Sequence, residues 1–402
     1  MTLVNDQKVS SRSTSRFGDD YLTFERARGS IDALDGLRTL AIVLVLFRHA
    51  IKAAESKVGA SFEIPLPWGY WNASIPMTNG WMGVDLFFVL SGFLIGGHLI
   101  RRRETFSWKS LGKYFGARAL RIVPTYYCVL LLVAFGVIPF FKPLAQETMP
   151  SLAWHMLFLQ DYLPSNFVIA FWSLGVEEKF YIVAPLLVLG TARVSNVRYR
   201  LLLLAGLTLT PMALRALTLE FISFDFASYR AYFETFRSPF HLTFEGLLIG
   251  VICAEIYSHP ALKSMMVHWA KPMLAVGCAL IFAHLVSVDL MAHIGYYDIL
   301  VQPLALSFGF GLMVMAAALI NPTSGWAASR FGLVGARLSY SLYLVHMTLI
   351  PIAMVLAVLS NTEGLLWFAV FFAIFVALSL MASMLLHFAV EKPFLQLKSR
   401  LF

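Results

Sequence analysis

Arg38 and His49 are a pair of side chains that could bind a phosphate and transfer a proton from the same helix. They lie eleven positions apart in the apolar stretch IDALDGLRTLAIVLVLFRHA, residues 31–50. On an α-helix this spacing returns to within about 20° of the same face and rises about 16 Å, so both side chains are expected on one face at different depths. A guanidinium can bind phosphate, and an imidazole can act as a general base. In the alternative interpretation Arg38 reaches a membrane interface and His49 is a packing residue.

A second candidate is the segment WSLGVEEKFY, residues 172–181, which carries Glu177, Glu178 and Lys179 inside an apolar stretch. Adjacent helical positions point about 100° apart, so at most one glutamate is expected to face a given site squarely. Burial of carboxylates in an apolar helix is unfavourable, which predicts a functional role for at least one of them. The alternative is a structural ion pair between Glu178 and Lys179.

Basic residues gather in the segment LGKYFGARALRIVP, residues 111–124. Arg118 and Arg121 lie about one helical turn apart, and arginine is suited to bidentate contacts with phosphate. Together with Arg38, these side chains are predicted to form a phosphate clamp at the cytoplasmic face. Contact with anionic lipid headgroups explains this segment equally well.

The segment GWMGVDLFFVLSGFLIGG, residues 80–97, carries Asp85 near its outer end and Ser91 deeper in the membrane. Asp85 is predicted near the depth of His49, so its carboxylate could orient the imidazole. Ser91 could be acylated, but no base lies near it in the sequence, and no covalent acyl-enzyme is expected. Small residues permit close helix packing, the role predicted for Gly83, Gly92, Gly96 and Gly97.

Further polar residues in apolar stretches are weaker candidates. They are Tyr340, Tyr343 and His346 in SYSLYLVH, His241 and Glu245 in the apolar stretch 239–257, and Glu391 in VEKPF. His346 is predicted in the middle of a span, whereas Glu391 stands at a helix end, where a local role in ending the helix is an alternative.

The composition indicates that membrane helices position these side chains. Of the 402 residues, 59% are hydrophobic and 13% are charged, and the mean hydropathy is +0.73. A water-soluble domain of this length does not usually have such a balance. The net charge of +8 is explained by basic loops between apolar spans, so no nucleic-acid partner is expected. The three cysteines have neither disulfide nor metal-ligand spacing, and no metal site is expected.

Ten apolar stretches are long enough, at about 20 residues each, to cross a bilayer as helices. They are residues 37–54, 82–100, 122–141, 171–190, 200–219, 239–257, 272–290, 297–320, 334–358 and 365–388. The basic residues alternate between connections in a way that places both termini in the cytoplasm. The prediction is an all-α polytopic membrane protein with its helices around a central polar cavity. It consists of a polar cytoplasmic tail at 1–30, a membrane domain at 31–395 and a short cytoplasmic tail at 396–402.

Six segments together carry a resemblance to a known family, because their order and spacing are those of its motifs. They are LDGLRTLAIVLVLFRH, GVDLFFVLSGFLI, ARALRIVP, WSLGVEEKFYI, SYSLYLVH and VEKPF. From about Ile31 onward the chain resembles the membrane acyltransferase type 3 family. The resemblance implies a ten-helix enzyme of the bacterial inner membrane. Such enzymes move acetyl or related acyl groups from cytoplasmic acyl-CoA to hydroxyls of lipopolysaccharide, exopolysaccharide or other envelope carbohydrate.

The resemblance also implies roles for individual residues. Arg38 and His49 match the family's motif of Arg, ten residues and His, which makes His49 the expected general base. Arg118 and Arg121 match its basic pair, and Glu177 and Glu178 match its paired glutamates. Asp85, Ser91, Tyr340 and His346 fall on further motif positions. Arg48 is a departure, because an apolar or aromatic residue is more usual before the histidine.

We therefore expect an O-acyltransferase in which Arg38, Arg118 and Arg121, with Tyr340 and His346, bind acetyl-CoA or another acyl-CoA. His49 takes the proton of the acceptor hydroxyl, while Asp85, Glu177 or Glu178 steadies the imidazolium. The acceptor is expected to be a carbohydrate or lipid-linked glycan, or alternatively a small molecule or lipid. A polytopic transporter is the main rival class, because buried charges also line solute paths. A lipid-binding scaffold is a third possibility, but it would not need polar residues inside its helices.

Overall fold

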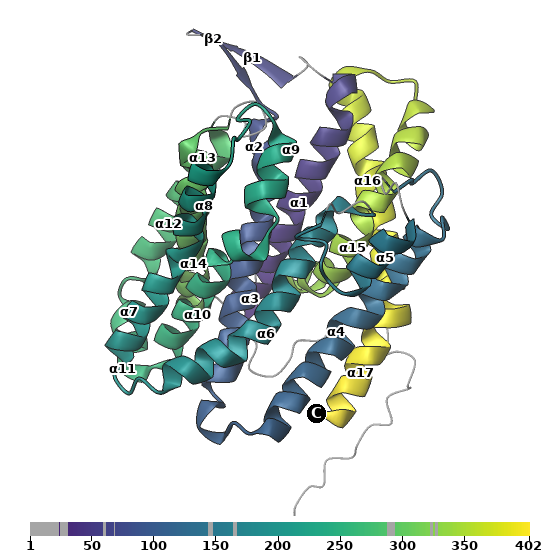
Figure 1. Ribbon diagram of the computed structural model, residues 1–402. Helices are drawn as coiled ribbons and strands as arrows, with labels where there is room; N and C mark the ends of the chain where they lie inside the picture. Colours follow the sequence, from purple (N-terminus) through teal and green to yellow (C-terminus); the bar gives the residue numbers. More distant parts are fainter. Residues whose placement is uncertain are drawn as a thin grey trace, which may run out of the picture.

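The fold is described from a computed structural model (Figure 1). It describes residues 24, 31–58, 62–67, 69–143, 148–163, 167–287, 294–321, 325 and 329–402. The predicted tail at 1–30 lies outside the described residues except for Phe24. The predicted membrane domain begins with the first long helix, α1 (Asp32–Val58).

Helices form nearly all of the regular structure, which confirms the predicted all-α class. The helices of twelve residues or more are α1 (Asp32–Val58), α3 (Gly83–Ile100), α4 (Trp108–Ala134), α6 (Trp172–Ala192), α7 (Val197–Thr208), α8 (Thr210–Phe221), α10 (Glu245–Ser258), α12 (Ala270–Val286), α14 (Gln302–Ile320), α15 (Arg330–Val358) and α16 (Gly364–Leu386). The shorter helical segments are α2 (Ile75–Thr78), η2 (Asn79–Met82), η3 (Arg103–Thr105), α5 (Thr148–Met156), η4 (Ile169–Phe171), α9 (Tyr229–Tyr232), η5 (Phe233–Arg237), η6 (Phe240–Leu242), α11 (Pro260–Val267), α13 (Tyr296–Leu300), η7 (His387–Glu391) and α17 (Lys392–Leu401).

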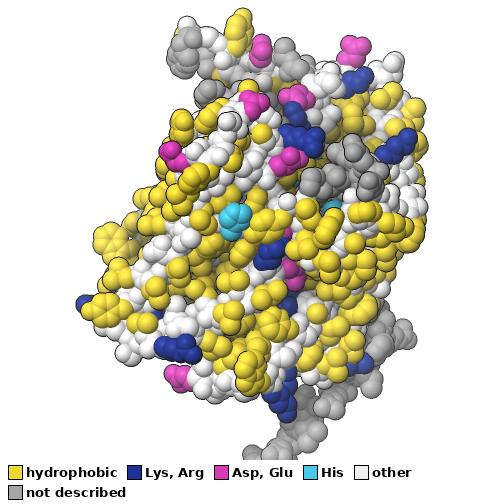
Figure 2. All heavy atoms as spheres, viewed as in Figure 1, with side chains coloured by type: hydrophobic (Ala, Val, Ile, Leu, Met, Phe, Trp, Pro, Cys, Tyr) yellow, Lys and Arg dark blue, Asp and Glu magenta, His cyan; other side chains and the backbone are white. Residues whose placement is uncertain are grey.

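One small sheet lies at an end of the helical bundle (Figure 1). Its strands β1 (Glu63–Leu66) and β2 (Gly69–Asn72) pair antiparallel in the connection between α1 and α2. The opposite end of the bundle carries the connection between α3 and α4 together with the C-terminal helix α17. Figure 2 shows mostly hydrophobic side chains across the middle of one face, with most charged side chains toward its ends. This distribution is typical of a bundle that crosses a bilayer.

Within the described residues, six helical segments are long and apolar enough to cross a membrane. They are 75–100, 108–134, 197–221, 302–320, 330–358 and 364–401, and the bent pair of α11 and α12, which turns by 72°, adds a seventh if it forms one span. The predicted ten stretches all contain helix, but α1 and α6 carry several charged residues and α10 has only 14 residues. The membrane bundle is therefore confirmed, and the count of ten stays a prediction.

Small residues bring α3 and α10 into backbone contact. A Cβ atom on Gly92 would collide with the backbone of Leu247, and one on Gly250 would collide with the backbone of Val89. Side chains at these two crossing points would force the helices apart, because neither backbone can move aside cheaply. The predicted packing role is thereby confirmed for Gly92.

Helix α1 packs against both α15 and α3 and lies inside the bundle (Figure 1). Helices α3, α10 and α14 pack on one side of it, while α15 packs against α16. Near the C-terminus the π-helical turn η7 joins α16 to α17, and α17 lies against α4. Helices α3 and α15 therefore flank α1 directly.

Candidate active site

The helix α1 carries Arg38 and His49 into two different cavities of the same bundle. It is continuous over both positions, so the geometry expected from their spacing holds. Arg38 lines a cavity toward the end of the molecule that carries α17, and His49 lines a cavity farther along α1. A third cavity, also lined by Arg38, lies between them.

The three cavities are called inner, middle and outer in their order along α1, beginning at the end of the molecule that carries α17. The inner cavity is bordered by Arg102, Lys113 and Lys398, and its volume is about 480 Å³. The middle cavity contains Ser91 and Glu177 and has a volume of about 100 Å³. The outer cavity contains His49, Trp81 and Trp172, with a volume of about 260 Å³. The middle cavity is therefore the smallest of the three.

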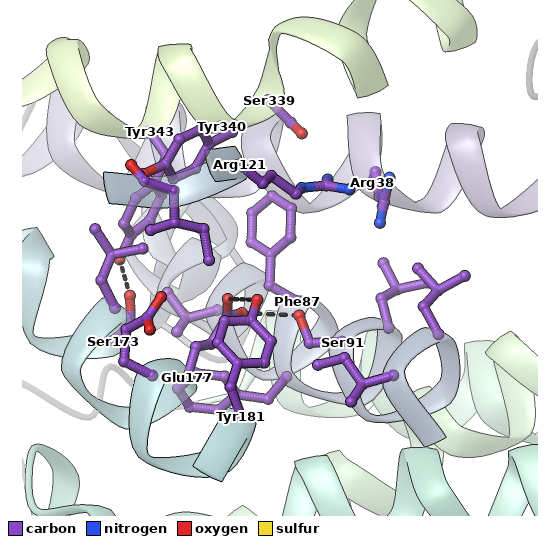
Figure 3. A pocket seen from close by; sticks show the side chains of 18 of the residues that line it. Arg38, Phe87, Ser91, Arg121, Ser173, Glu177, Tyr181, Ser339, Tyr340 and Tyr343 are labelled. Atoms are coloured by element: carbon purple, nitrogen blue, oxygen red, sulfur yellow. Dashed lines mark hydrogen bonds between the residues drawn. The ribbon is translucent and has the colours of Figure 1, made fainter. Parts of the chain in front are cut away.

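Neighbouring cavities share lining side chains. The inner and middle cavities have Arg38, Arg118, Arg121, Ser339 and Tyr340 in common. The middle and outer cavities have Val84 and Tyr343 in common. Figure 3 shows Arg38 and Arg121 at one end of the middle cavity and Ser173 and Tyr343 at the other. The three cavities therefore follow one another between the arginines and His49.

The three predicted arginines converge where the inner and middle cavities meet. Arg118 lies over the rings of Tyr114 and Tyr181, with its guanidinium carbon 5.7 and 5.2 Å from the two ring centroids. These rings hold the guanidinium by cation–π contact while leaving its hydrogen-bond donors available in the ring plane. The arrangement can bind an anion with two or more oxygen atoms.

Glu177 is one of two acidic side chains that line the middle cavity. Its Oε1 accepts a hydrogen bond from Ser91 Oγ at 2.8 Å, and its Oε2 accepts one from Tyr181 Oη at 3.3 Å (Figure 3). The structure thus supplies Ser91 with a neighbouring carboxylate that the linear sequence did not reveal. Glu178 also lines this cavity.

Lys179 pairs away from the cavities, so the alternative of a Glu178–Lys179 pair is wrong. Its Nζ lies 2.5 Å from Oδ1 of Asp161 and donates to the carbonyl oxygen of Phe158 at 2.7 Å. Asp161 stands in the connection before α6, where burial raises the pKa of its carboxyl group even though Lys179 acts in the opposite direction. Lys179 therefore anchors that connection to α6.

His49 and His346 form a hydrogen-bonded pair between α1 and α15. Nδ1 of His49 lies 2.9 Å from the carbonyl oxygen of Val45 and 3.2 Å from Nε2 of His346. Nδ1 of His346 lies 2.9 Å from the carbonyl oxygen of Tyr343. Because a carbonyl only accepts, both Nδ1 atoms carry a proton. The one Nδ1 proton of His49 is shared between the carbonyl oxygen of Val45 and Nε2 of His346, which both accept it. In the neutral pair, Nε2 of His49 keeps its lone pair.

The position of His346 differs from the one we expected. We grouped it with the donor-binding arginines, but it borders neither of the cavities that Arg38 lines and instead contacts His49. Tyr340 does lie with the arginines, and its hydroxyl donates to the carbonyl oxygen of Ile122 at 2.9 Å. The two residues stand on the same helix, but the helix carries them to different depths.

Asp85 is engaged with a residue that the sequence did not connect to it. Both of its carboxylate oxygens accept hydrogen bonds from Arg237, each at 2.8 Å. The guanidinium lies between the rings of Trp81 and Trp172, 5.0 and 5.2 Å from their centroids. Burial opposes the charge of Arg237, but Asp85 more than offsets this and the pKa of Arg237 is raised. The expectation that Asp85 orients His49 is therefore not met.

Comparison with known proteins identifies the type of chain that carries this site. Residues 31–384 match the family model of the type 3 acyltransferases, which is described as an acyltransferase domain. The chain belongs to the acyltransferase type 3 family. The expected resemblance is thus confirmed over most of the sequence, and the arginines, the glutamates and both histidines fall within the matched region.

Several relatives of this type 3 acyltransferase are named O-acetyltransferases. It is 25% identical over 369 residues to peptidoglycan O-acetyltransferase OatA of Listeria monocytogenes, covering 87% of this chain and 53% of the relative. It is 25% identical over 342 residues to O-acetyltransferase OatA of Staphylococcus aureus, covering 80% and 50%. The chain thus spans about half the length of these relatives.

A further relative matches a shorter part of the chain. The putative acetyltransferase ORF330 of Acidianus two-tailed virus is 36% identical over 132 residues, which cover 33% of this chain and 36% of the relative. No solved structure matches the chain.

The inner cavity of this type 3 acyltransferase contains basic residues that sequence reasoning did not assign to the site. They are Arg102, Lys113, Arg337 and Lys398. The sequence had marked them only as positive charges in cytoplasmic connections, which is a statement about topology. Only packing of α17 against α4 brings the last of them to the same cavity as the others.

Proposed function

We propose that this protein is an integral membrane O-acyltransferase that moves an acetyl group from acetyl-CoA to a hydroxyl of an envelope carbohydrate. The observation that carries the proposal is the succession of neighbouring cavities between three arginines and the His49–His346 pair. Family membership and the names of the relatives support transfer of an acetyl group to oxygen. We further propose that it lies in the bacterial inner membrane with ten spans and both termini in the cytoplasm.

The donor enters from the inner cavity. The phosphates of acyl-CoA are bound by Arg38, Arg118 and Arg121, which offer donors suited to bidentate contacts. The pantetheine arm then extends through the narrow middle cavity, where Ser91 and Glu177 provide hydrogen-bonding groups for its amides. The rise of about 16 Å between Arg38 and His49 is within reach of an extended arm of this kind. The thioester therefore arrives beside His49.

His49 acts as the general base. Its Nε2 takes the proton of the acceptor hydroxyl while the hydroxyl oxygen attacks the thioester carbonyl carbon. The new C–O bond forms, the C–S bond breaks, and CoA leaves as the thiolate, which takes up a proton afterwards. Nε2 of His346 accepts the hydrogen bond of the Nδ1 proton and stabilises the imidazolium that His49 becomes.

The carboxylates take a different part from the one expected from the sequence. Asp85 secures Arg237 between Trp81 and Trp172 at the outer cavity and so shapes its wall. Glu177 and Glu178 line the middle cavity and belong with the donor arm rather than with the base. Transfer is direct, without acylation of Ser91. Ser91 lies seven residues beyond Val84, the residue of α3 at the border with the outer cavity, a rise of about 10 Å along the helix.

The outer cavity receives the acceptor. Its lining combines the aromatic side chains of Trp81, Trp172 and Tyr229 with His49. Aromatic faces pack well against sugar rings while polar groups hold their hydroxyls. Peptidoglycan, lipopolysaccharide and exopolysaccharide all present such hydroxyls, and the Listeria relative is named for peptidoglycan. A small-molecule or lipid acceptor is the alternative substrate class.

The test is acetyl transfer by the purified protein in lipid nanodiscs. With radiolabelled acetyl-CoA and a fragment of envelope glycan, we expect labelled glycan and an equal amount of free CoA. In the variant His49→Ala the rate of CoA release is expected to fall by a factor of roughly 100 or more, because a positioned general base contributes a factor of about that size. Passage of the glycan or of acetyl-CoA across sealed vesicles without any transfer would instead establish a transporter.

A further inference from the structure

We infer that the inner cavity contains a second phosphate subsite, which selects donors that carry the 3′-phosphate of CoA. Lys113 on α4 and Lys398 on α17, together with Arg102, form this subsite. The inference rests on the proposed function, because it concerns the donor of that reaction. A second subsite explains why the inner cavity is larger and more basic than binding of the pyrophosphate alone requires.

The basic residues of the inner cavity fall into two sets. Arg38, Arg118 and Arg121 border both the inner and the middle cavity and therefore lie at the start of the narrow passage. Lys113, Lys398 and Arg102 border the inner cavity without bordering the middle one, and Arg337 does the same. The two sets are thus arranged one behind the other along the route that the donor would take.

The covalent order of groups in CoA matches this arrangement. Its thiol is followed by the pantetheine arm, the pyrophosphate and finally the adenosine with its 3′-phosphate. If the arm occupies the middle cavity, the pyrophosphate lies at the shared arginines. The 3′-phosphate then falls in the remaining part of the inner cavity, at the second set of basic residues. Lysine binds such a terminal phosphate as a compact point charge.

Helix α17 completes this part of the cavity although it lies beyond the region that the family model matches. The match ends at residue 384, whereas α17 covers 392–401. The π-helical turn η7 directs α17 onto α4, where the ring of Phe402 contacts Gly116. The glycine leaves the space that this ring occupies, because its own Cβ would lie 2.5 Å from Phe402 Cζ. Leu395, Lys398 and Phe402 consequently form one wall of the inner cavity.

Acidic groups do not neutralise the lysines of the second set, Lys113 and Lys398. Among the residues that line the inner cavity, Glu391 is the acidic one, and its Oε2 already accepts from His387 Nδ1 at 2.9 Å and from Ser341 Oγ at 2.7 Å. Within the described part of the chain, neither Lys113 nor Lys398 forms an ion pair. The cavity therefore has uncompensated positive charge, which favours a ligand with several phosphates.

The subsite is tested by calorimetric binding of CoA and of 3′-dephospho-CoA to the full chain in nanodiscs of phosphatidylcholine. We expect the wild type to bind CoA roughly tenfold or more tightly than dephospho-CoA, as for one or two charge-assisted hydrogen bonds. Lys398→Gln and Lys113→Gln are each expected to lower this ratio severalfold while leaving the dissociation constant of dephospho-CoA nearly unchanged. Arg400→Gln on α17 and Lys109→Gln on α4 are matched controls at exposed sites outside the cavity and are expected to keep the wild-type ratio.

Equal affinity of the wild type for the two ligands would overturn the subsite, and so would equal losses in Lys398→Gln and Arg400→Gln. An anionic headgroup is the other source of a phosphate for these lysines. If the lysine variants bind CoA as the wild type does but retain less phosphatidylglycerol in native mass spectrometry, the cluster is a lipid site and the inference fails. Acetyl transfer is measured on the same samples. Selective binding of CoA without transfer would refute the proposed function alone, whereas transfer without selectivity would refute the subsite alone.

Discussion

Nε2 of His346 lies 3.2 Å from Nδ1 of His49, so two helices that are distant in sequence present one paired imidazole unit. The backbone carbonyls of Val45 and Tyr343 determine where the protons of this unit lie. The result resembles the arrangement in which a catalytic histidine is oriented by an acceptor on its second nitrogen, with an imidazole in place of a carboxylate. This relationship underlies the first prediction.

Replacement of His346 is expected to lower kcat. In His346→Ala the imidazolium of His49 loses the imidazole acceptor and keeps only the carbonyl oxygen of Val45. A hydrogen bond to a charged group contributes about 1.5–3 kcal/mol, so kcat should fall about 10- to 100-fold. His346→Gln should recover part of the loss, because its amide oxygen can accept the same hydrogen bond. The measurement is steady-state transfer with acetyl-CoA, with His268→Gln at an exposed site as control. Equal activity of the alanine variant and the wild type would contradict the paired arrangement.

The shared arginines are expected to control donor binding. Arg121→Gln should raise KM for acetyl-CoA roughly tenfold and change kcat less, because the guanidinium contacts the nucleotide end and not the reacting atoms. Arg198→Gln, an exposed arginine outside the cavities, serves as control. The kinetic constants are obtained by varying acetyl-CoA at saturating acceptor. A fall in kcat with unchanged KM would place Arg121 at the reacting centre instead.

Glu177 is expected to act as a hydrogen-bond acceptor. Glu177→Ala removes the partner of both Ser91 and Tyr181, whereas Glu177→Gln keeps an acceptor oxygen. We therefore expect a loss of roughly tenfold in kcat/KM for the alanine variant, as for one hydrogen bond to a charged group, and a smaller loss for the glutamine variant. Ser91→Ala should remain active, and acetylated Ser91 should be absent from peptide mass spectra. An acetyl-Ser91 that forms and then passes its acetyl group to the acceptor would show that transfer proceeds in two steps.

The ion pair of Asp85 and Arg237 is expected to hold the fold together. Both side chains are buried, so removing one partner leaves an uncompensated charge and destabilises by roughly 3–5 kcal/mol. Asp85→Ala should lower the thermal unfolding midpoint in detergent by several degrees. The variant with both Asp85→Ala and Arg237→Met should lose less than Asp85→Ala alone. If the two single changes simply add, the pair is not coupled.

The crossing of α3 and α10 is expected to reject any side chain at Gly92. Gly92→Val places atoms where the backbone of Leu247 lies, so the helices must separate and the folded yield should fall sharply. Gly190 has open space around its Cα atom, so Gly190→Ala is expected to leave the yield unchanged. Size-exclusion profiles of the detergent-extracted variants measure the folded fraction. A monodisperse Gly92→Val protein at wild-type yield would refute the close crossing.

Much of the architecture followed from the order of residues alone. The apolar composition required a membrane bundle, and a spacing of eleven residues placed Arg38 and His49 on one helical face because helical geometry is local. The ordered motifs indicated the family, and the arginines before α4's apolar half indicated an anion site. Each of these inferences needs only neighbours within one helix or the composition of the chain.

The partners of the polar side chains were decided by the tertiary structure. The order of residues indicated that Asp85, Glu177, His346 and Lys398 stand in or beside apolar helices, but it could not tell which groups they contact. Asp85 meets Arg237, Glu177 meets Ser91, His346 meets His49, and Lys398 reaches the inner cavity through the packing of α17 on α4. The physical reason is that hydrogen bonds and ion pairs depend on distances of about 3 Å between atoms of different helices. Those distances are set by how the helices pack together.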